Sequence, residues 1–166
     1  LGDGCMQEGV AAEAASLAGT QQLGNLIAIY DDNGISIDGD VKGWFGDDTR
    51  GRFEAYGWNV IGPVDGHDIA RIETLLKTAV ALHEPVLIHL ITQKGRGYAP
   101  AEKTPQEFHG IGKFDPETGL SETVSVPTFS DIFGQELGRM AASDKTVCAI
   151  TAAMQHGTGL DQFASE

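Results

Sequence analysis

Two short motifs near the N-terminus carry side chains suited to binding a divalent metal ion. A Gly-Asp-Gly turn occupies residues 2–4, and Asp31-Asp32-Asn33-Gly34 follows the apolar run at residues 26–30. A helical stretch and a strand separate Asp3 from Asn33, which is one strand–helix–strand step of a parallel sheet. Because such sheets bind ligands at their carboxyl edge, we expect the two side chains to meet there. Carboxylate and amide oxygens suit Mg²⁺ that is also held by a diphosphate.

The predicted metal ligands are the Asp3 carboxylate, the Asn33 amide oxygen and the backbone carbonyl oxygen of Ile35. Two diphosphate oxygens and a water molecule would complete an octahedron of about six ligands. The glycines on either side of Asp3 let a diphosphate approach the backbone and leave amide groups exposed at a helix start. The alternative interpretation is that Asp3 only caps a helix and Asn33 only forms a turn.

A histidine in the long segment from residue 98 to residue 126 is the candidate for proton transfer. This segment shows neither helical nor strand periodicity, which is typical of a linker or a functional lid. His109 could donate to a diphosphate or substrate oxygen, and a free histidine pKa near ~6.5 suits proton transfer. The alternative is an exposed loop histidine without a catalytic role. Basic side chains cluster around it, at Lys94, Arg96, Lys103 and Lys113.

The elements that would position these residues can be predicted from apolar periodicity. Apolar runs predict strands at residues 26–30, 58–61 and 86–92, and helical patterns predict helices at residues 8–18, 48–56 and 69–82. Gly19 is expected to end the first of these helices. After Pro127, a helix at 130–142 and a strand at 147–151 predict the start of a second unit. The alternation predicts an α/β fold with a parallel sheet.

Composition limits the classes of protein to which this chain can belong. Its 166 residues, 41% of them apolar, are enough for one domain or for one domain and part of another. A net charge of −13 argues against nucleic-acid binding, and no stretch is apolar enough to span a membrane. Cys5 and Cys148 lack metal-binding spacing, so free thiols in a reducing cytoplasm are expected. Leu1 is expected to end a strand, and the chain to be a fragment.

With these residues in place, the sequence resembles two related families of thiamine diphosphate-dependent enzymes. Residues 1–60 resemble bacterial transketolase, on the stretches Gly-Asp-Gly-Cys-Met-Gln-Glu-Gly, Asp-Asp-Asn-Gly-Ile-Ser-Ile-Asp-Gly and Arg-Phe-Glu-Ala-Tyr-Gly-Trp. Residues 61–166 resemble 1-deoxy-D-xylulose-5-phosphate synthase, on Lys-Gly-Arg-Gly-Tyr-Ala-Pro-Ala-Glu at 94–102, Phe-His-Gly at 108–110 and Lys-Phe-Asp-Pro at 113–116. The chain therefore looks like a hybrid or a fragment within this superfamily.

Both families use thiamine diphosphate and Mg²⁺, so the resemblance implies both cofactors. It implies a three-layer αβα fold, with residues 1–115 as the diphosphate-binding domain, 116–126 as a linker and 127–166 as the beginning of a pyrimidine-binding domain. It places Asp3, Asn33 and the Ile35 carbonyl at the metal, and His109 at the cofactor as the catalytic residue. The cofactor contacts that it implies are Gly2, Asp3, Gly4, Cys5, Asn33, Ile35 and His109.

The larger portion of the chain resembles the synthase, which favours one reaction. That reaction forms 1-deoxy-D-xylulose 5-phosphate from pyruvate and glyceraldehyde 3-phosphate with release of CO₂. One alternative is transketolase activity, in which a two-carbon ketol unit moves between sugar phosphates. The partners implied are these small molecules and a second copy of the chain in a cytoplasmic homodimer, with no nucleic acid and no membrane.

The sequence also departs from both families. The loop between Ser36 and Gly62 is short, as in transketolase, whereas the synthase usually carries a longer insertion there. Both families place further active-site histidines before the Gly-Asp-Gly strand and a pyrimidine-contacting glutamate in a later segment, whose motif Glu166 does not match. A non-catalytic cofactor-binding fragment is therefore an alternative. A nucleotide-binding domain is disfavoured because the chain lacks a Lys-Ser/Thr phosphate loop and a G-x-G-x-x-G turn.

Overall fold

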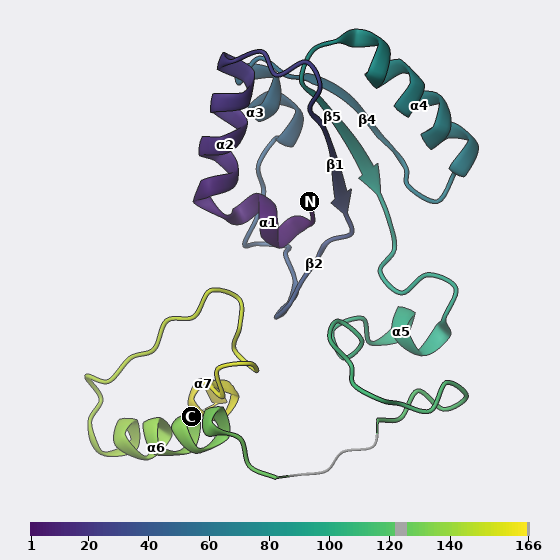
Figure 1. The fold of residues 1–166 in the computed structure, drawn as a ribbon. Coiled ribbons are helices and arrows are strands. Elements are labelled where there is room, and N and C mark those ends of the chain that lie inside the picture. The colour runs from purple at the N-terminus through teal and green to yellow at the C-terminus, as the bar shows by residue number, and fades with distance from the viewer. Residues whose placement is uncertain (122–125, 166) are drawn as a thin grey trace.

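The computed structural model describes residues 1–121 and 126–165 (Figure 1). Its first part contains the helices α1 (Asp3–Gln7), α2 (Gly9–Thr20), α3 (Thr49–Ala55) and α4 (Ile69–Leu82), and the strands β1 (Ile27–Asp32), β2 (Ile35–Ser36), β3 (Gly39–Asp40), β4 (Asn59–Asp65) and β5 (Val86–Ile91). The helices α5 (Ala99–Lys103), α6 (Phe129–Ser143) and α7 (Asp161–Ser165) follow. No described helix has the length and apolar composition needed to cross a lipid bilayer.

The main sheet is parallel and has the strand order β1-β5-β4. Alternate residues of the central strand β5 face opposite layers: Leu87 packs in a cluster with residues of α2 and α3, whereas Val86 and Ile88 pack with residues of α4. Figure 1 shows the same arrangement, with α2 and α3 on one side of the sheet and α4 on the other. The predicted α/β fold with a parallel sheet and three layers is confirmed.

Small residues of helix α2 face the core of the protein. Ala15 and Ala18 are buried, and the Trp58 indole nitrogen donates to the Ala15 carbonyl oxygen at 2.8 Å. The prediction that Gly19 ends this helix is wrong, because α2 continues to Thr20. A Cβ atom on Gly19 would lie 1.7 Å from the Tyr56 carbonyl oxygen, so this glycine lets α2 approach the end of α3.

Helix α4 follows the sequence prediction closely. The Asp68 side chain accepts from the Arg71 amide at 2.9 Å and starts the helix. His83, with a φ angle of 52°, ends it in the left-handed region. Leu75 and Ala79 are buried against β5, as the apolar periodicity predicts.

Residues 34–46 and the segment after residue 98 contain short regular elements. Residues 34–46 include the antiparallel β2–β3 pair, because the tight bends around it bring the two dipeptides together. In the segment from residue 98 onward, α5 forms, and an isolated bridge joins Phe114 to Ser121. Tyr98, Phe108 and Phe114 pack against one another with ring centroids 5.5–6.1 Å apart. Residues 122–125 of the predicted linker lie outside the described residues.

The C-terminal part agrees with the predictions in its helix and differs in its strand. Helix α6 begins with a capping box in which the Thr128 hydroxyl accepts from the Asp131 amide at 3.2 Å and the Asp131 carboxylate accepts from the Thr128 amide at 2.7 Å. Residues 147–151 do not form the expected strand. A strand needs a neighbour that supplies backbone hydrogen bonds, and no described residue pairs with this segment.

Candidate metal and diphosphate site

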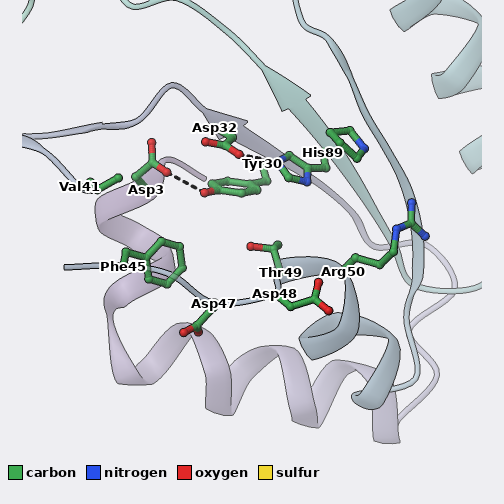
Figure 2. Close-up of a pocket in the computed structure, with 11 residues that line it drawn as sticks. Asp3, Tyr30, Asp32, Val41, Phe45, Asp47, Asp48, Thr49, Arg50 and His89 are labelled. Carbon is green, nitrogen blue, oxygen red and sulfur yellow. Dashed lines mark hydrogen bonds and ion pairs between the residues drawn. The ribbon is translucent and has the colours of Figure 1, made fainter. Parts of the chain in front are cut away.

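The structure joins the two N-terminal motifs through the Asp3 carboxylate. Asp3 is the first residue of α1 and is 1% exposed. One of its oxygens, Oδ2, accepts from the backbone amides of Asn33 at 3.1 Å and Gly34 at 3.0 Å. The other, Oδ1, accepts from the Tyr30 hydroxyl at 2.7 Å (Figure 2). The Asp3 carboxylate therefore meets the backbone of the Asn33 turn at the carboxyl edge of the sheet, and metal binding by Asp3 and Asn33 stays a prediction.

The Asn33 side chain shapes its own turn. Its Oδ1 atom accepts from the Ile35 amide at 3.1 Å, and its Nδ2 atom donates to the Asp31 carboxylate at 3.1 Å. Gly34 has a φ angle of 70°, a conformation that favours glycine. Asn33 therefore forms the turn, and metal binding by its amide oxygen stays a prediction, because that oxygen can accept a second interaction.

The residues present fit a cation and a diphosphate. A carboxylate offers about four acceptor positions, and the hydrogen bonds above occupy three of those on Asp3. A Cβ atom placed on Gly2, Gly4 or Gly34 would meet nothing within 4 Å, so the backbone faces open space at these positions. Among the described residues, no group of three or more His, Cys, Asp or Glu side chains could hold a metal ion. A site here would therefore draw on the amide and backbone oxygens that the sequence indicates.

Two aromatic side chains that the sequence predictions left out of the site support Asp3. Tyr30 is 2% exposed and its ring lies 4.8 Å, between centroids, from the His89 ring. The His89 Nε2 atom contacts the Asp32 carboxylate at 2.7 Å. Burial, followed by the hydrogen bond and the negative charge of Asp3, raises the pKa of Tyr30 well above its ordinary value. The Tyr30 hydroxyl therefore stays protonated at neutral pH and acts as the donor.

A signal for this arrangement exists in the sequence, although it is incomplete. Tyr30 and Asp32 are two positions apart in a strand and so lie on the same face. The partner strand and its register are required to place His89 beside them, and β1 pairs with β5 through Tyr30 and His89. The His89 side chain is partly buried, with 12% of it exposed.

A cavity of about 440 Å³ borders Asp3 on this side of the sheet. Figure 2 shows Asp3, Tyr30, Asp32 and His89 along the strand side of it, opposite residues of α3 and of the loop before that helix. The Arg50 guanidinium contacts the Glu54 carboxylate at 2.8 Å and the Gly62 carbonyl oxygen. The residues that line the cavity are Asp3, Tyr30, Asp32, Val41, Phe45, Asp47, Asp48, Thr49, Arg50, Pro63 and His89.

His109 lies apart from these contacts. It is exposed, and its Nδ1 atom contacts the Lys94 ammonium group. An ammonium group can only donate, so Nδ1 accepts and a neutral ring carries its proton on Nε2. Among the described residues, no hydrogen bond joins His109 to Asp3 or Asn33. Figure 1 shows α5, which precedes it, beyond the end of the sheet to which β1 and β5 point. Its catalytic role stays a prediction, as does the cofactor contact of the exposed Cys5.

Comparison with known sequences identifies the domain that carries these features. The family described as "Transketolase, thiamine diphosphate binding domain" matches residues 1–123. The 1-deoxy-D-xylulose-5-phosphate synthase of Nitratidesulfovibrio vulgaris is 37% identical over 98% of this chain and 33% of its own length. A chromosomal transketolase of Cupriavidus necator is 52% identical over 74% of this chain and 18% of its own length.

Solved structures give the same result. Transketolase from Campylobacter jejuni superposes with a TM-score of 0.59 at 28% identity, over 97% of this chain and 22% of that chain. A Pichia stipitis transketolase variant, H261F, superposes with a TM-score of 0.58 at 32% identity, over 99% of this chain and 24% of that chain.

The matches cover most of this chain but only part of each relative. The chain spans about a third of the length of the synthase relative and a quarter or less of the transketolases. The synthase alignment runs over 213 positions, more than the 166 residues here, so it contains gaps. The expected position of a missing insertion, between Ser36 and Gly62, stays a prediction. Since the family match covers residues 1–123 and includes the whole Asp3 site, the chain belongs to the transketolase family of thiamine diphosphate-binding domains.

Proposed function

We propose that this chain supplies the Mg²⁺- and diphosphate-binding part of a thiamine diphosphate-dependent enzyme that transfers a ketol unit. The observation that carries the proposal is the buried Asp3 carboxylate, which meets the Asn33–Gly34 turn at the carboxyl edge of a parallel sheet. Open space at the glycines beside it leaves room for a diphosphate. Residues 1–115 are then the diphosphate-binding domain, and residues 127–166 begin the pyrimidine-binding domain.

Each residue has a defined role in this proposal. Asp3, Asn33 and the Ile35 carbonyl hold Mg²⁺, and the backbone from Gly2 to Cys5 faces the diphosphate at the start of α1. Bound thiamine diphosphate supplies an electron sink for chemistry at a carbonyl carbon. His109, with a proton on Nε2, donates to a diphosphate or substrate oxygen, and the Lys94 contact keeps Nδ1 as the acceptor.

The reaction that we propose is synthesis of 1-deoxy-D-xylulose 5-phosphate from pyruvate and glyceraldehyde 3-phosphate with release of CO₂. Support comes from synthase relatives that align with 98–99% of this chain. The alternative is ketol transfer between sugar phosphates, which the higher identity to transketolase over 74% of the chain favours. The full-length enzyme separates the two: CO₂ release from pyruvate supports the synthase, and ketol transfer from xylulose 5-phosphate supports transketolase. Family membership also supports a cytoplasmic homodimer.

A second candidate function is cofactor binding without turnover by this chain. The observation that favours it is that His109, the candidate for proton transfer, is exposed and contacts Lys94, with no hydrogen bond to Asp3 or Asn33 among the described residues. Calorimetry with thiamine diphosphate and Mg²⁺, followed by an assay of the same sample, tests this candidate. Product formed by this chain alone overturns it, and binding without product supports it for this chain while the assay of the full-length enzyme tests the first proposal.

The metal site itself is tested by replacing Asp3. We expect Asp3→Asn to weaken Mg²⁺-dependent binding of thiamine diphosphate at least about 100-fold, since even residues behind the ligands cost 10–100-fold. A matched control is Asp65→Asn, because Asp65 ends β4 at the same edge of the sheet and its carboxylate accepts only from the His67 amide among the described contacts. Equal affinities for the unmodified chain and Asp3→Asn in calorimetry would remove the proposed site.

A further inference from the structure

We infer that Tyr30 is a positioning residue for the metal site: its hydroxyl fixes the Asp3 carboxylate, and the His89–Asp32 pair holds the Tyr30 ring in place. This inference rests on the proposed role of Asp3 as a Mg²⁺ ligand. It extends the site from the two sequence motifs to a pair of neighbouring strands, and it assigns a function to buried Tyr30 and to the partly buried His89 and Asp32.

Asp3 needs an anchor because its backbone offers little restraint. It stands between two glycines at the start of a five-residue helix. The backbone amides of Asn33 and Gly34 fix only Oδ2. The Tyr30 hydroxyl fixes Oδ1, and two fixed oxygens define the rotation of the carboxylate. A ligand held this way needs no reorientation when the cation arrives, which is how residues behind metal ligands raise affinity.

Tyr30 is in turn held from the neighbouring strand. The register of β1 and β5 places Tyr30 opposite His89, and their rings are inclined by 33°. His89 is tied to Asp32, which lies on the same face of β1 as Tyr30. The contacts therefore run from Asp32 through His89 and Tyr30 to Asp3, and Figure 2 shows these four side chains grouped beside the cavity.

Removing the Tyr30 hydroxyl group distinguishes a role in positioning Asp3 from a role in packing alone. A phenylalanine at position 30 would keep the ring and its contact with His89 and would lose only the bond to Asp3. If Tyr30 serves packing alone, this change affects stability without affecting the cation. If it positions Asp3, the cation dependence of cofactor binding changes while the fold is retained.

The experiment measures the Mg²⁺ concentration that gives half-maximal binding of thiamine diphosphate to the full chain. We expect Tyr30→Phe to raise this concentration about tenfold, within the range for residues behind metal ligands, while saturating Mg²⁺ restores cofactor affinity. The matched control is Trp58→Phe, which removes another buried aromatic hydrogen bond, to the Ala15 carbonyl. We expect it to lower the thermal midpoint without changing the Mg²⁺ requirement.

A second variant keeps the test decisive if Tyr30→Phe does not fold. His89→Phe keeps an aromatic ring beside Tyr30 and removes the contact with Asp32, and we expect a smaller rise of the Mg²⁺ requirement than for Tyr30→Phe, because His89 reaches Asp3 only through Tyr30. Unchanged Mg²⁺ requirements in the folded variants, with Asp3→Asn impaired, overturn the inference and leave the metal site intact. If Asp3→Asn is also unimpaired, the metal site fails and the inference fails with it.

Discussion

The N-terminal region (residues 1–92) and the C-terminal region (residues 126–165) use their apolar residues in opposite ways. In the N-terminal region, both core clusters form around the parallel sheet, and Val86, Leu87 and Ile88 are 0–1% exposed. In the C-terminal region, Phe129 and Ile150 are each 97% exposed. The buried residues among its described positions are Gly134, Gly138 and Leu160.

The difference shows which structural signals act locally and which need a partner. Helix α6 forms in the C-terminal region because its capping box and its backbone bonds lie within one segment. An apolar segment with strand propensity depends on a neighbouring strand for its backbone hydrogen bonds and for the burial of its side chains. The candidate metal site at Asp3 and the Asn33 turn lies in the region with a packed core, which provides the rigid support that a metal site needs.

The largest expected effect comes from removing the same side chain from each region. Ile88→Ala removes a side chain that is 1% exposed in the central strand, and we expect it to lower the free energy of unfolding by about 2–5 kcal/mol. Ile150→Ala removes one that is 97% exposed, and surface changes usually stay within about 0.5 kcal/mol. Urea denaturation followed by Trp58 fluorescence measures both. Comparable losses for the two variants would show that the regions do not differ as described.

A smaller contrast concerns two glycines at which helices approach a backbone carbonyl. A Cβ atom on Gly19 would lie 1.7 Å from the Tyr56 oxygen, and one on Gly134 would lie 1.8 Å from the Gly159 oxygen. Tyr56 packs against the core cluster of the N-terminal region, so Gly19→Ala must displace packed residues. We expect it to lower the free energy of unfolding by about 1–3 kcal/mol, the usual cost of overpacking.

The Gly134→Ala variant tests whether the C-terminal region accommodates the added methyl group by moving its backbone. Near Gly159, His156, Gly157 and Asp161 are exposed and only Leu160 is buried among the described neighbours from residue 155 to residue 163, so we expect the loop that carries Gly159 to move away from α6. Alanine also favours a helix over glycine by about 1 kcal/mol. We expect unchanged or increased helicity of α6 by NMR chemical shifts, with altered shifts for α7. A loss of stability as large as that of Gly19→Ala would contradict this.

The distinction between local signals and signals that need a packing partner also explains which elements of the fold the sequence predicts. The strands at 27–32, 59–65 and 86–91 and the helix at 69–82 follow from periodicity because packing supports the local preference. The segment 147–151 has a similar composition, yet the described residues offer it no neighbouring strand. The sequence predicts a helix end at Gly19, because sequence alone does not reveal which backbone a glycine approaches.

The residues of the candidate site also differ in whether the sequence alone predicts where they lie. Asp3 and Asn33 are predictable together because one strand–helix–strand step fixes where both lie. Tyr30 and His89 are distant in the sequence, and their contact depends on the strand order β1-β5-β4 and on the register. His109 was chosen from a motif, and its contact with Lys94 requires the path of the segment after β5.

The smallest expected effect is a pH dependence confined to the start of α6. The Thr128 amide, and then the Thr128 hydroxyl, hold the pKa of the exposed Asp131 carboxyl below its ordinary value. A carboxyl with a lowered folded-state pKa stabilises the folded form above its unfolded pKa, near ~3.9, and loses this contribution as pH falls through the folded value. Between pH 5 and pH 2, we therefore expect the first turn of α6 to lose helicity, seen in site-resolved NMR shifts.

The pH dependence also shows whether this cap acts independently of the packed core. Asp131→Asn keeps a similar side-chain shape without the charge, so the first turn of α6 should lose its dependence on pH in that range. Because the capping box lies within residues 128–131, Ile88→Ala should leave the dependence unchanged even as it destabilises the sheet. A shift of the Asp131 titration in Ile88→Ala would show that the two regions are coupled, and the contrast between a local helix and a cooperative sheet would then have to be abandoned.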